Sequence, residues 1–129
     1  MRKKSAPRPT DGELAILRVL WRRGASTVRD VMEELNRTQA TGYTTVLKLM
    51  QIMTEKELVV RDESERTHVY QAAYTEDQTQ RQLVSDLLER AFDGSAAKLV
   101  LQALATNKTS PEELDEIRKL LNKQRGGPR

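Results

Sequence analysis

Two kinds of hydrophobic periodicity follow one another in this 129-residue chain, and their order limits the folds open to it. Up to residue 56, apolar residues recur three and four apart, which is the spacing of amphipathic helices. From Leu58 to Tyr74, two short runs rich in β-branched and aromatic residues flank the polar segment 63–66, which predicts two strands around a tight turn. Three helices followed by a hairpin form a winged helix, so we predict that fold for residues 9–74.

The first helix is expected to begin at the capping box Thr10-Asp11-Gly12-Glu13, where the threonine and glutamate side chains each bond a free backbone N–H. Its apolar residues, down to about Trp21, cover more than one side. We therefore expect this helix to stand at the centre of a small core. Gly24 is suited to end it in a left-handed conformation.

The second and third helices are predicted to be joined by a short polar connection. Ser26 or Thr27 caps the second helix, which stops near Asn36, and Thr41 caps the third. One side of the third helix is apolar, with Val46, Leu49, Met50 and Met53. The other side offers short hydroxyls, then a cation and an amide, which suit the bottom of a DNA groove. The candidate base contacts are Thr41, Thr44, Thr45, Lys48 and Gln51. The alternative is an ordinary solvated helix face.

The net charge of +3 does not by itself predict DNA binding, because it comes from one end of the chain. Residues 1–8, expected to form a flexible arm, carry four basic and no acidic side chains, whereas residues 9–74 carry nine basic and ten acidic ones. A basic patch on the folded part must therefore arise from the folding. The candidate contacts to the DNA backbone or the minor groove are Arg2, Lys3, Lys4, Arg8, Arg37, Arg61 and Arg66. His68 is expected to be a wing residue that faces solvent or phosphate.

Composition argues against catalysis and against a membrane location. The chain has one histidine, no cysteine and no glycine-rich phosphate loop, so we expect no enzyme activity, no metal site and no cofactor. No apolar run approaches the roughly 20 residues that span a bilayer, and no apolar segment follows the basic start. We therefore expect a cytoplasmic protein.

Residues 75–123 are predicted to form a helical dimerisation domain, followed by a frayed tail at 124–129. A capping box at Thr75-Glu76-Asp77-Gln78 starts a helix through Phe92, and Ser95 and Ser110 cap two more. These helices carry more apolar surface than they can bury among themselves, which favours a homodimer. The candidate interface residues are Leu83, Leu87, Leu99, Val100, Leu104, Leu114, Ile117 and Leu121. The alternative is that this segment folds back on the first domain and leaves a monomer.

With its elements placed, the chain resembles the penicillinase-repressor family, which comprises bacterial regulators of β-lactamase and methicillin-resistance genes, and the related copper-responsive repressors. The resemblance covers Pro9 to Lys123. The motifs that carry it are Thr10-Asp11-Gly12-Glu13-Leu14-Ala15-Ile16-Leu17 to Leu20-Trp21, Thr27-Val28-Arg29-Asp30-Val31, Gly42-Tyr43-Thr44-Thr45-Val46, Lys56-Glu57-Leu58-Val59, Arg66-Thr67-His68-Val69-Tyr70 and Phe92-Asp93-Gly94-Ser95. Each is weak alone, but their order and spacing are fairly specific.

The resemblance implies a homodimeric winged-helix repressor that binds a palindromic operator in double-stranded DNA and controls antibiotic-resistance or stress genes. It puts Tyr43, Thr44, Thr45 and Lys48 in the reading helix, and we count Tyr43 among the backbone contacts. Resistance-type members are inactivated by proteolysis, which implies a protease or sensor as a further partner. The family's cleaved pair is an asparagine followed by an aromatic residue, whereas this chain has Gln102-Ala103 there. Copper-responsive relatives use C-terminal cysteines, which this chain lacks.

The leading hypothesis is therefore a dimeric, sequence-specific transcriptional repressor. The alternative is a winged-helix module whose third helix binds a protein partner and not DNA. A duplex-binding measurement distinguishes the two.

Overall fold

The structure is a computed structural model that describes residues 8–126, and the chain forms two units that divide between Asp86 and Leu87. The basic residues Arg2, Lys3 and Lys4 lie outside the described residues, as does the end of the predicted tail. The division falls within the helix Glu76–Ala91, whereas the boundary predicted from the sequence, between residues 74 and 75, precedes that helix and stays a prediction. Each unit is described separately below.

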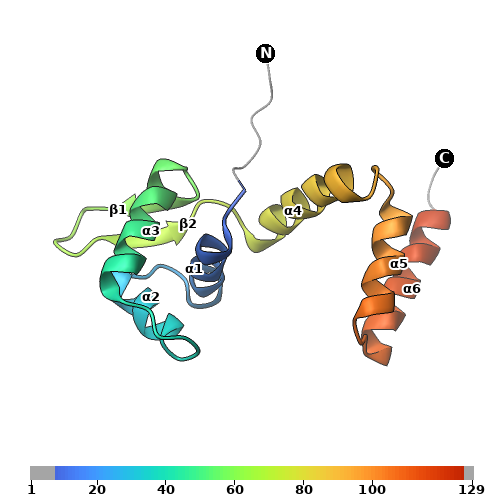
Figure 1. The fold of residues 1–129 in the computed structure, drawn as a ribbon, viewed down its shortest axis with the longest axis horizontal. Coiled ribbons are helices and arrows are strands. Elements are labelled where there is room, and N and C mark those ends of the chain that lie inside the picture. The colour runs from blue at the N-terminus through green and yellow to red at the C-terminus, as the bar shows by residue number, and fades with distance from the viewer. Residues whose placement is uncertain (1–7, 127–129) are drawn as a thin grey trace, which may run out of the picture. The chain divides into compact units, whose positions relative to one another are not determined.

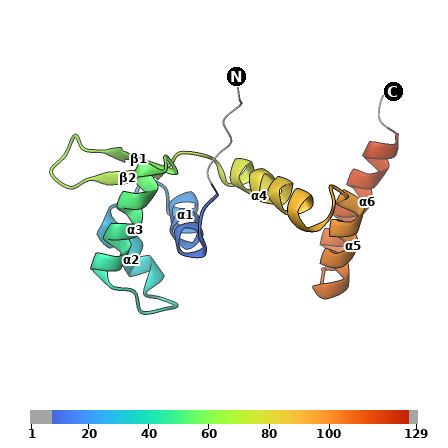
Figure 2. The same ribbon diagram turned by 45° about the horizontal axis from the view of Figure 1, so that its top comes forward.

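The first unit is a winged helix, as predicted (Figure 1). It contains α1 (Asp11–Arg23), α2 (Val28–Leu35), α3 (Tyr43–Glu55), β1 (Val59–Asp62) and β2 (Val69–Ala72). The three helices contact one another, and α3 leads directly into the hairpin, which lies beside it in both views (Figures 1 and 2). Within residues 8–126, one long side of α3 is exposed.

Local capping chemistry sets the starts of α1 and α2. Thr10 Oγ1 accepts from Glu13 N at 3.2 Å and Glu13 Oε1 accepts from Thr10 N at 2.9 Å, which confirms the first predicted capping box. Thr27, not Ser26, caps α2, in a second box with Asp30. The hydrogen bond from the Thr27 N–H, helped by the nearby charge of Arg23, outweighs the effect of burial and holds the pKa of the Asp30 carboxyl below its ordinary value.

Ser26 has a different role from capping, because it extends the hairpin. Ser26 N donates to Tyr70 O at 3.0 Å, and Tyr70 N donates to Ser26 O at 2.8 Å. The antiparallel strands pair Val59 with Ala72 and Asp62 with Val69. The segment before α2 therefore pairs with the other edge of β2, through Ser26. This confirms the predicted extended piece and fixes the wing to the helices.

A single apolar core holds the helices and the hairpin together. It includes the faces of all three helices that the wheel predicted to be buried, and the inward-facing side chains of both strands. Its buried members are Ile16, Leu17, Val19, Leu20, Val28, Val31, Val46, Met50, Met53, Leu58, Val59 and Tyr70. Trp21 is only partly buried, and its indole Nε1 donates to Tyr74 O at 2.9 Å at the edge of this core.

Two backbone predictions at helix ends are corrected. Gly24 ends α1 with φ 90° and ψ −161°, a conformation that glycine adopts easily but that is not the left-handed helical one. Thr41 does not cap α3, because the capping position is Gly42, which has no side chain to accept a hydrogen bond. The Thr41 hydroxyl donates instead to Gln39 O at 3.0 Å, and Asn36 Oδ1 accepts from the Thr41 N–H.

A partly buried ion pair joins the start of α1 to the end of α3. Lys56 Nζ lies 2.6 Å from Glu13 Oε1, and the Glu13 side chain is only 3% exposed. Burial raises the pKa of Glu13, but the hydrogen bonds and charge of Lys56 and the hydrogen bonds from Thr10 outweigh it and hold this pKa below its ordinary value. The pair therefore stabilises the packing of α3 against α1 when Glu13 is ionised.

We expect Lys56→Met to lower the free energy of unfolding by about 2–3 kcal/mol at pH 7, less than for a fully buried pair because the lysine is 31% exposed. A folded-state pKa below the unfolded one gives stability that is present above about pH 4.5 and is lost as the pH falls through the folded pKa. The loss caused by Lys56→Met should therefore shrink in acid. Urea unfolding at pH 7 and pH 3 measures it.

The matched control is Lys123→Met, which removes an exposed lysine from α6, where no carboxylate lies within 4 Å among residues 8–126. It should change the free energy of unfolding by less than about 0.5 kcal/mol. Equal midpoints for Lys56→Met and Lys123→Met at pH 7 would contradict a stabilising role for the buried pair.

The second unit contains the end of α4 (Glu76–Ala91), then α5 (Ala96–Thr106) and α6 (Pro111–Arg125), which lie side by side (Figures 1 and 2). The capping boxes predicted at Thr75 and Ser110 are both present, and Ser95 caps α5. After α4, Asp93 and Gly94 adopt positive φ. Neither α5 nor α6 contains a buried residue. No helix among the described residues is long and apolar enough to cross a membrane.

Candidate nucleic-acid interface

The free side of α3 is the first component of the candidate interface. Val46, Met50 and Met53 are fully buried, which anchors the helix in the core. On the opposite side every predicted contact within the helix is exposed, as the wheel indicated. These residues are Thr44, Thr45, Lys48 and Gln51. The helix is therefore held rigidly by one side, and the other side presents hydroxyls, an ammonium group and an amide to a ligand.

The start of α3 differs from the sequence prediction. Thr41 lies in the connection before the helix, half-buried, and its hydroxyl is bonded to the backbone. Tyr43 is the first helical residue, with 46% of its surface exposed. Since Gly42 offers no side-chain cap, the N–H groups of the first turn remain available to solvent or to a ligand.

The hairpin is the second component, and its tip is internally bonded. Arg61 Nε lies 2.7 Å from Glu63 Oε2, and hydrogen bonds to Tyr70 and Glu63 raise the pKa of Arg61. Asp62 Oδ1 accepts from Ser64 N at 2.9 Å, which lowers the pKa of Asp62. The end of β1 and the start of the turn therefore place carboxylates beside Arg61.

The described basic candidates fall into two groups. Arg37, which follows α2, pairs with Glu34 at 3.1 Å, and Arg61 of β1 pairs with Glu63. Arg66 and His68 are exposed on the segment that enters β2, and His68 lies just before the strand in which the sequence placed it. Arg8 is exposed before α1.

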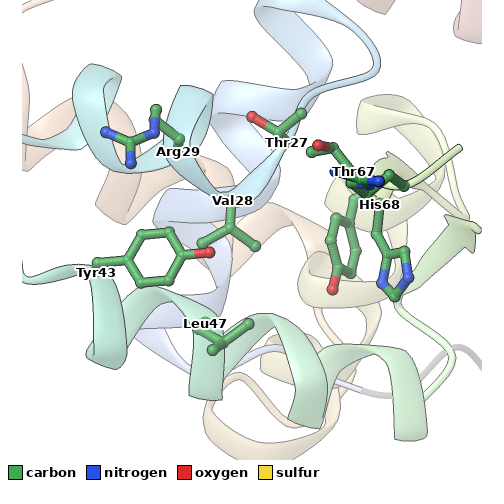
Figure 3. A pocket seen from close by; sticks show the side chains of 9 residues that line it. Thr27, Val28, Arg29, Tyr43, Leu47, Thr67 and His68 are labelled. Carbon is green, nitrogen blue, oxygen red and sulfur yellow. The ribbon is translucent and has the colours of Figure 1, made fainter.

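The fold brings three of the predicted contacts together at one cleft. Tyr43, Arg66 and His68 line a cleft of about 510 Å³ between α2, α3 and the hairpin, which we call the wing cleft. Figure 3 shows Tyr43 on one side of it and His68 on the other. The sequence analysis missed Arg29 and Thr67, which also line it. The sequence could predict that Arg29 and Thr67 are exposed on a helix and a turn. It could not predict that they line the same cleft.

The predicted dimer contacts are spread over α4, α5 and α6, and none is buried within the chain. Four are exposed and four are half-buried. The exposed ones are Leu87, Val100, Leu114 and Leu121, and the half-buried ones are Leu83, Leu99, Leu104 and Ile117. Leu101 and Leu120 are further exposed apolar side chains of α5 and α6. Gln102 and Ala103 are exposed but lie inside α5, where cleavage would require the helix to open.

Comparison with known proteins settles the family. The family model described as penicillinase repressor matches residues 9–123. The chain belongs to the penicillinase repressor family. This match covers both units of the structure, so the family extends beyond the winged helix to the second unit.

Several relatives match over most of the length of this chain. The chain is 30% identical over 118 residues to the transcriptional regulator BlaI of Mycobacterium tuberculosis, covering 91% of this chain and 85% of that protein. It is 23% identical over 122 residues to the penicillinase repressor of Bacillus licheniformis, covering 95% of each. It is 18% identical over 115 residues to the methicillin resistance regulatory protein MecI of Staphylococcus aureus, covering 89% and 94%. The family is thus one of transcriptional repressors and not of enzymes.

Solved structures show the same winged-helix fold. The DNA-binding domain of the repressor BlaI in solution matches with a TM-score of 0.51 and 22% identity, over 59% of this chain and 93% of that domain. The monomeric form of Bacillus licheniformis BlaI, solved in complex with the blaP half-operator, matches with a TM-score of 0.50 and the same identity and coverage.

Proposed function

We propose that this chain is a cytoplasmic, homodimeric repressor that binds an inverted-repeat operator through α3 and blocks transcription. The observation that carries the proposal is the division of α3 into a fully buried side and an exposed side with Thr44, Thr45 and Lys48. Relatives that bear the names of transcriptional regulators, and a fold neighbour solved on half-operator DNA, support it.

Each surface has a stated task in this proposal. Thr44, Thr45, Lys48 and Gln51 face base edges in the major groove, where short hydroxyls and hydrogen-bonding groups discriminate bases. The wing lies along the backbone, where contacts fix orientation without reading sequence. The exposed apolar residues of α5 and α6 bury themselves against a second copy, and the two-fold symmetry of such a dimer matches an inverted repeat.

Selection of purified protein against random duplex pools tests the proposal. We expect enrichment of an inverted repeat, with each half-site contacted by one α3, and a log-log decline of affinity with salt of about 0.9 per contacted phosphate. If no sequence is enriched at moderate salt, the proposed function is wrong. Genome-wide mapping of bound sites in the native cell then identifies the operator and its genes together.

A further inference from the structure

We propose that the wing cleft is a phosphate-binding site for the DNA backbone, with Arg29 and Arg66 as its two cationic ligands. This inference rests on the proposed function and deepens it, because it assigns Arg29 a role that the sequence analysis did not consider. In this proposal, Arg29 and Arg66 supply the two positive charges that hold the DNA backbone beside the wing.

The charge of the wing cleft is the first argument. Its nine lining residues include two arginines and no aspartate or glutamate. They are Thr27, Val28, Arg29, Tyr43, Leu47, Arg66, Thr67, His68 and Tyr70. Residues 9–74 as a whole carry one more acidic than basic side chain, so folding has separated the charges here. A donor-rich lining without carboxylates suits a phosphodiester, which has only acceptors to offer.

The availability of these two arginines is the second argument. Among the other described arginines of this unit that were predicted to contact the backbone, Arg37 and Arg61 are held by glutamates at 3.1 and 2.7 Å, and Arg8 does not line the wing cleft. Within residues 8–126, neither Arg29 nor Arg66 has a carboxylate within 4 Å. They can therefore meet a phosphate without first breaking an ion pair, and a guanidinium can bind it through two parallel hydrogen bonds.

The position of the wing cleft is the third argument. Figure 3 shows Arg29 and Tyr43 on one side and Thr67 and His68 on the other, with Leu47 of α3 between them. The cleft thus borders the first turns of α3, whose exposed side carries the proposed base contacts. A helix that enters the major groove has a phosphate backbone along its flank. Arg29 from α2 and Arg66 from the wing would hold that backbone from both sides.

Operator titrations of Arg29→Gln and Arg66→Gln test the proposal, with Arg22→Gln as the matched control. Arg22 is an exposed arginine of α1 that lines a different cleft. The probes are the duplex enriched from the random pool and a shuffled duplex of the same composition. We expect each cleft variant to bind both duplexes about tenfold more weakly, and the salt slope of log K to fall by about 0.9 for each phosphate that the variant no longer binds.

A charge-preserving variant and the ratio of operator to shuffled affinity test the phosphate contact further. Arg29→Lys keeps the charge but loses the paired hydrogen bonds, so it should bind between wild type and Arg29→Gln. The ratio of operator to shuffled affinity should stay constant, because a phosphate contact carries no sequence information. The inference is overturned if wild type selects an operator and Arg29→Gln matches Arg22→Gln in affinity and salt slope. If wild type selects no operator, it is the proposed function that fails.

Discussion

Thr45→Ala combined with Lys48→Ala is expected to weaken binding of the selected operator by about a hundredfold while the protein remains folded and dimeric. Both side chains are exposed on the free side of α3, so their removal leaves no cavity and exposes no buried group. Good contacts to base edges are each worth roughly 1–3 kcal/mol, and about 1.4 kcal/mol corresponds to a factor of ten. Unlike loss of Arg29, this change should reduce the preference for operator over shuffled duplex.

The matched control is Thr54→Ala with Lys119→Ala, which removes the same atoms elsewhere. Thr54 lies near the end of α3, with its hydroxyl donating to Met50 O at 2.8 Å, and Lys119 is exposed on α6. Fluorescence titration should give this variant nearly wild-type operator affinity. Undiminished binding by the Thr45 and Lys48 variant would favour the protein-interaction module, since α3 would then not read DNA.

Sequence reasoning succeeded where the interactions are local. The predicted boxes at Thr10, Thr75 and Ser110 each join residues three apart, so their geometry follows from helix chemistry alone. The buried side of α3 follows in the same way from the spacing of Val46, Met50 and Met53, and the hairpin from its alternating residues. The order of these elements, three helices and then a hairpin, predicted the winged helix that the structure confirms.

Sequence reasoning failed for a loop side chain that competes for the start of a helix, and for a contact between distant segments. Thr41 looked like a cap, but the side chain of Asn36 accepts its N–H, and the helix begins beyond Gly42. The pair between Glu13 and Lys56 joins residues 43 apart, which no helix or strand period connects.

The wing cleft is the most consequential case, because it combines the start of α2, the start of α3 and the turn before β2. Its charge is a property of the fold. Counting charges over residues 9–74 gives a slightly acidic domain and conceals a cleft lined by arginine without carboxylates. A basic cleft therefore does not require a basic domain.

Leu121→Glu is expected to dissociate the proposed dimer, with the dissociation constant rising by about a hundredfold or more. Leu121 is 55% exposed in the single chain, so a glutamate there should not disturb the folding of one copy. In a two-fold symmetric dimer both copies carry the substitution, so two glutamates are placed against apolar side chains of the interface. A loss of about 1.4 kcal/mol per copy already reaches that factor.

The control is Lys119→Glu, which places a glutamate on the same helix, α6, but on the side opposite to Leu121 by helical spacing. Sedimentation across a range of protein concentrations should show a dimer for this control and a monomer for Leu121→Glu. The monomer should keep affinity for a single half-site, since α3 and the wing cleft are unchanged, and lose affinity for the full inverted repeat. A Leu121→Glu protein that sediments as a dimer would instead place the interface elsewhere. In the proposed function, dimerisation acts on the operator by linking two half-sites, because α3 and the wing cleft both belong to a single chain.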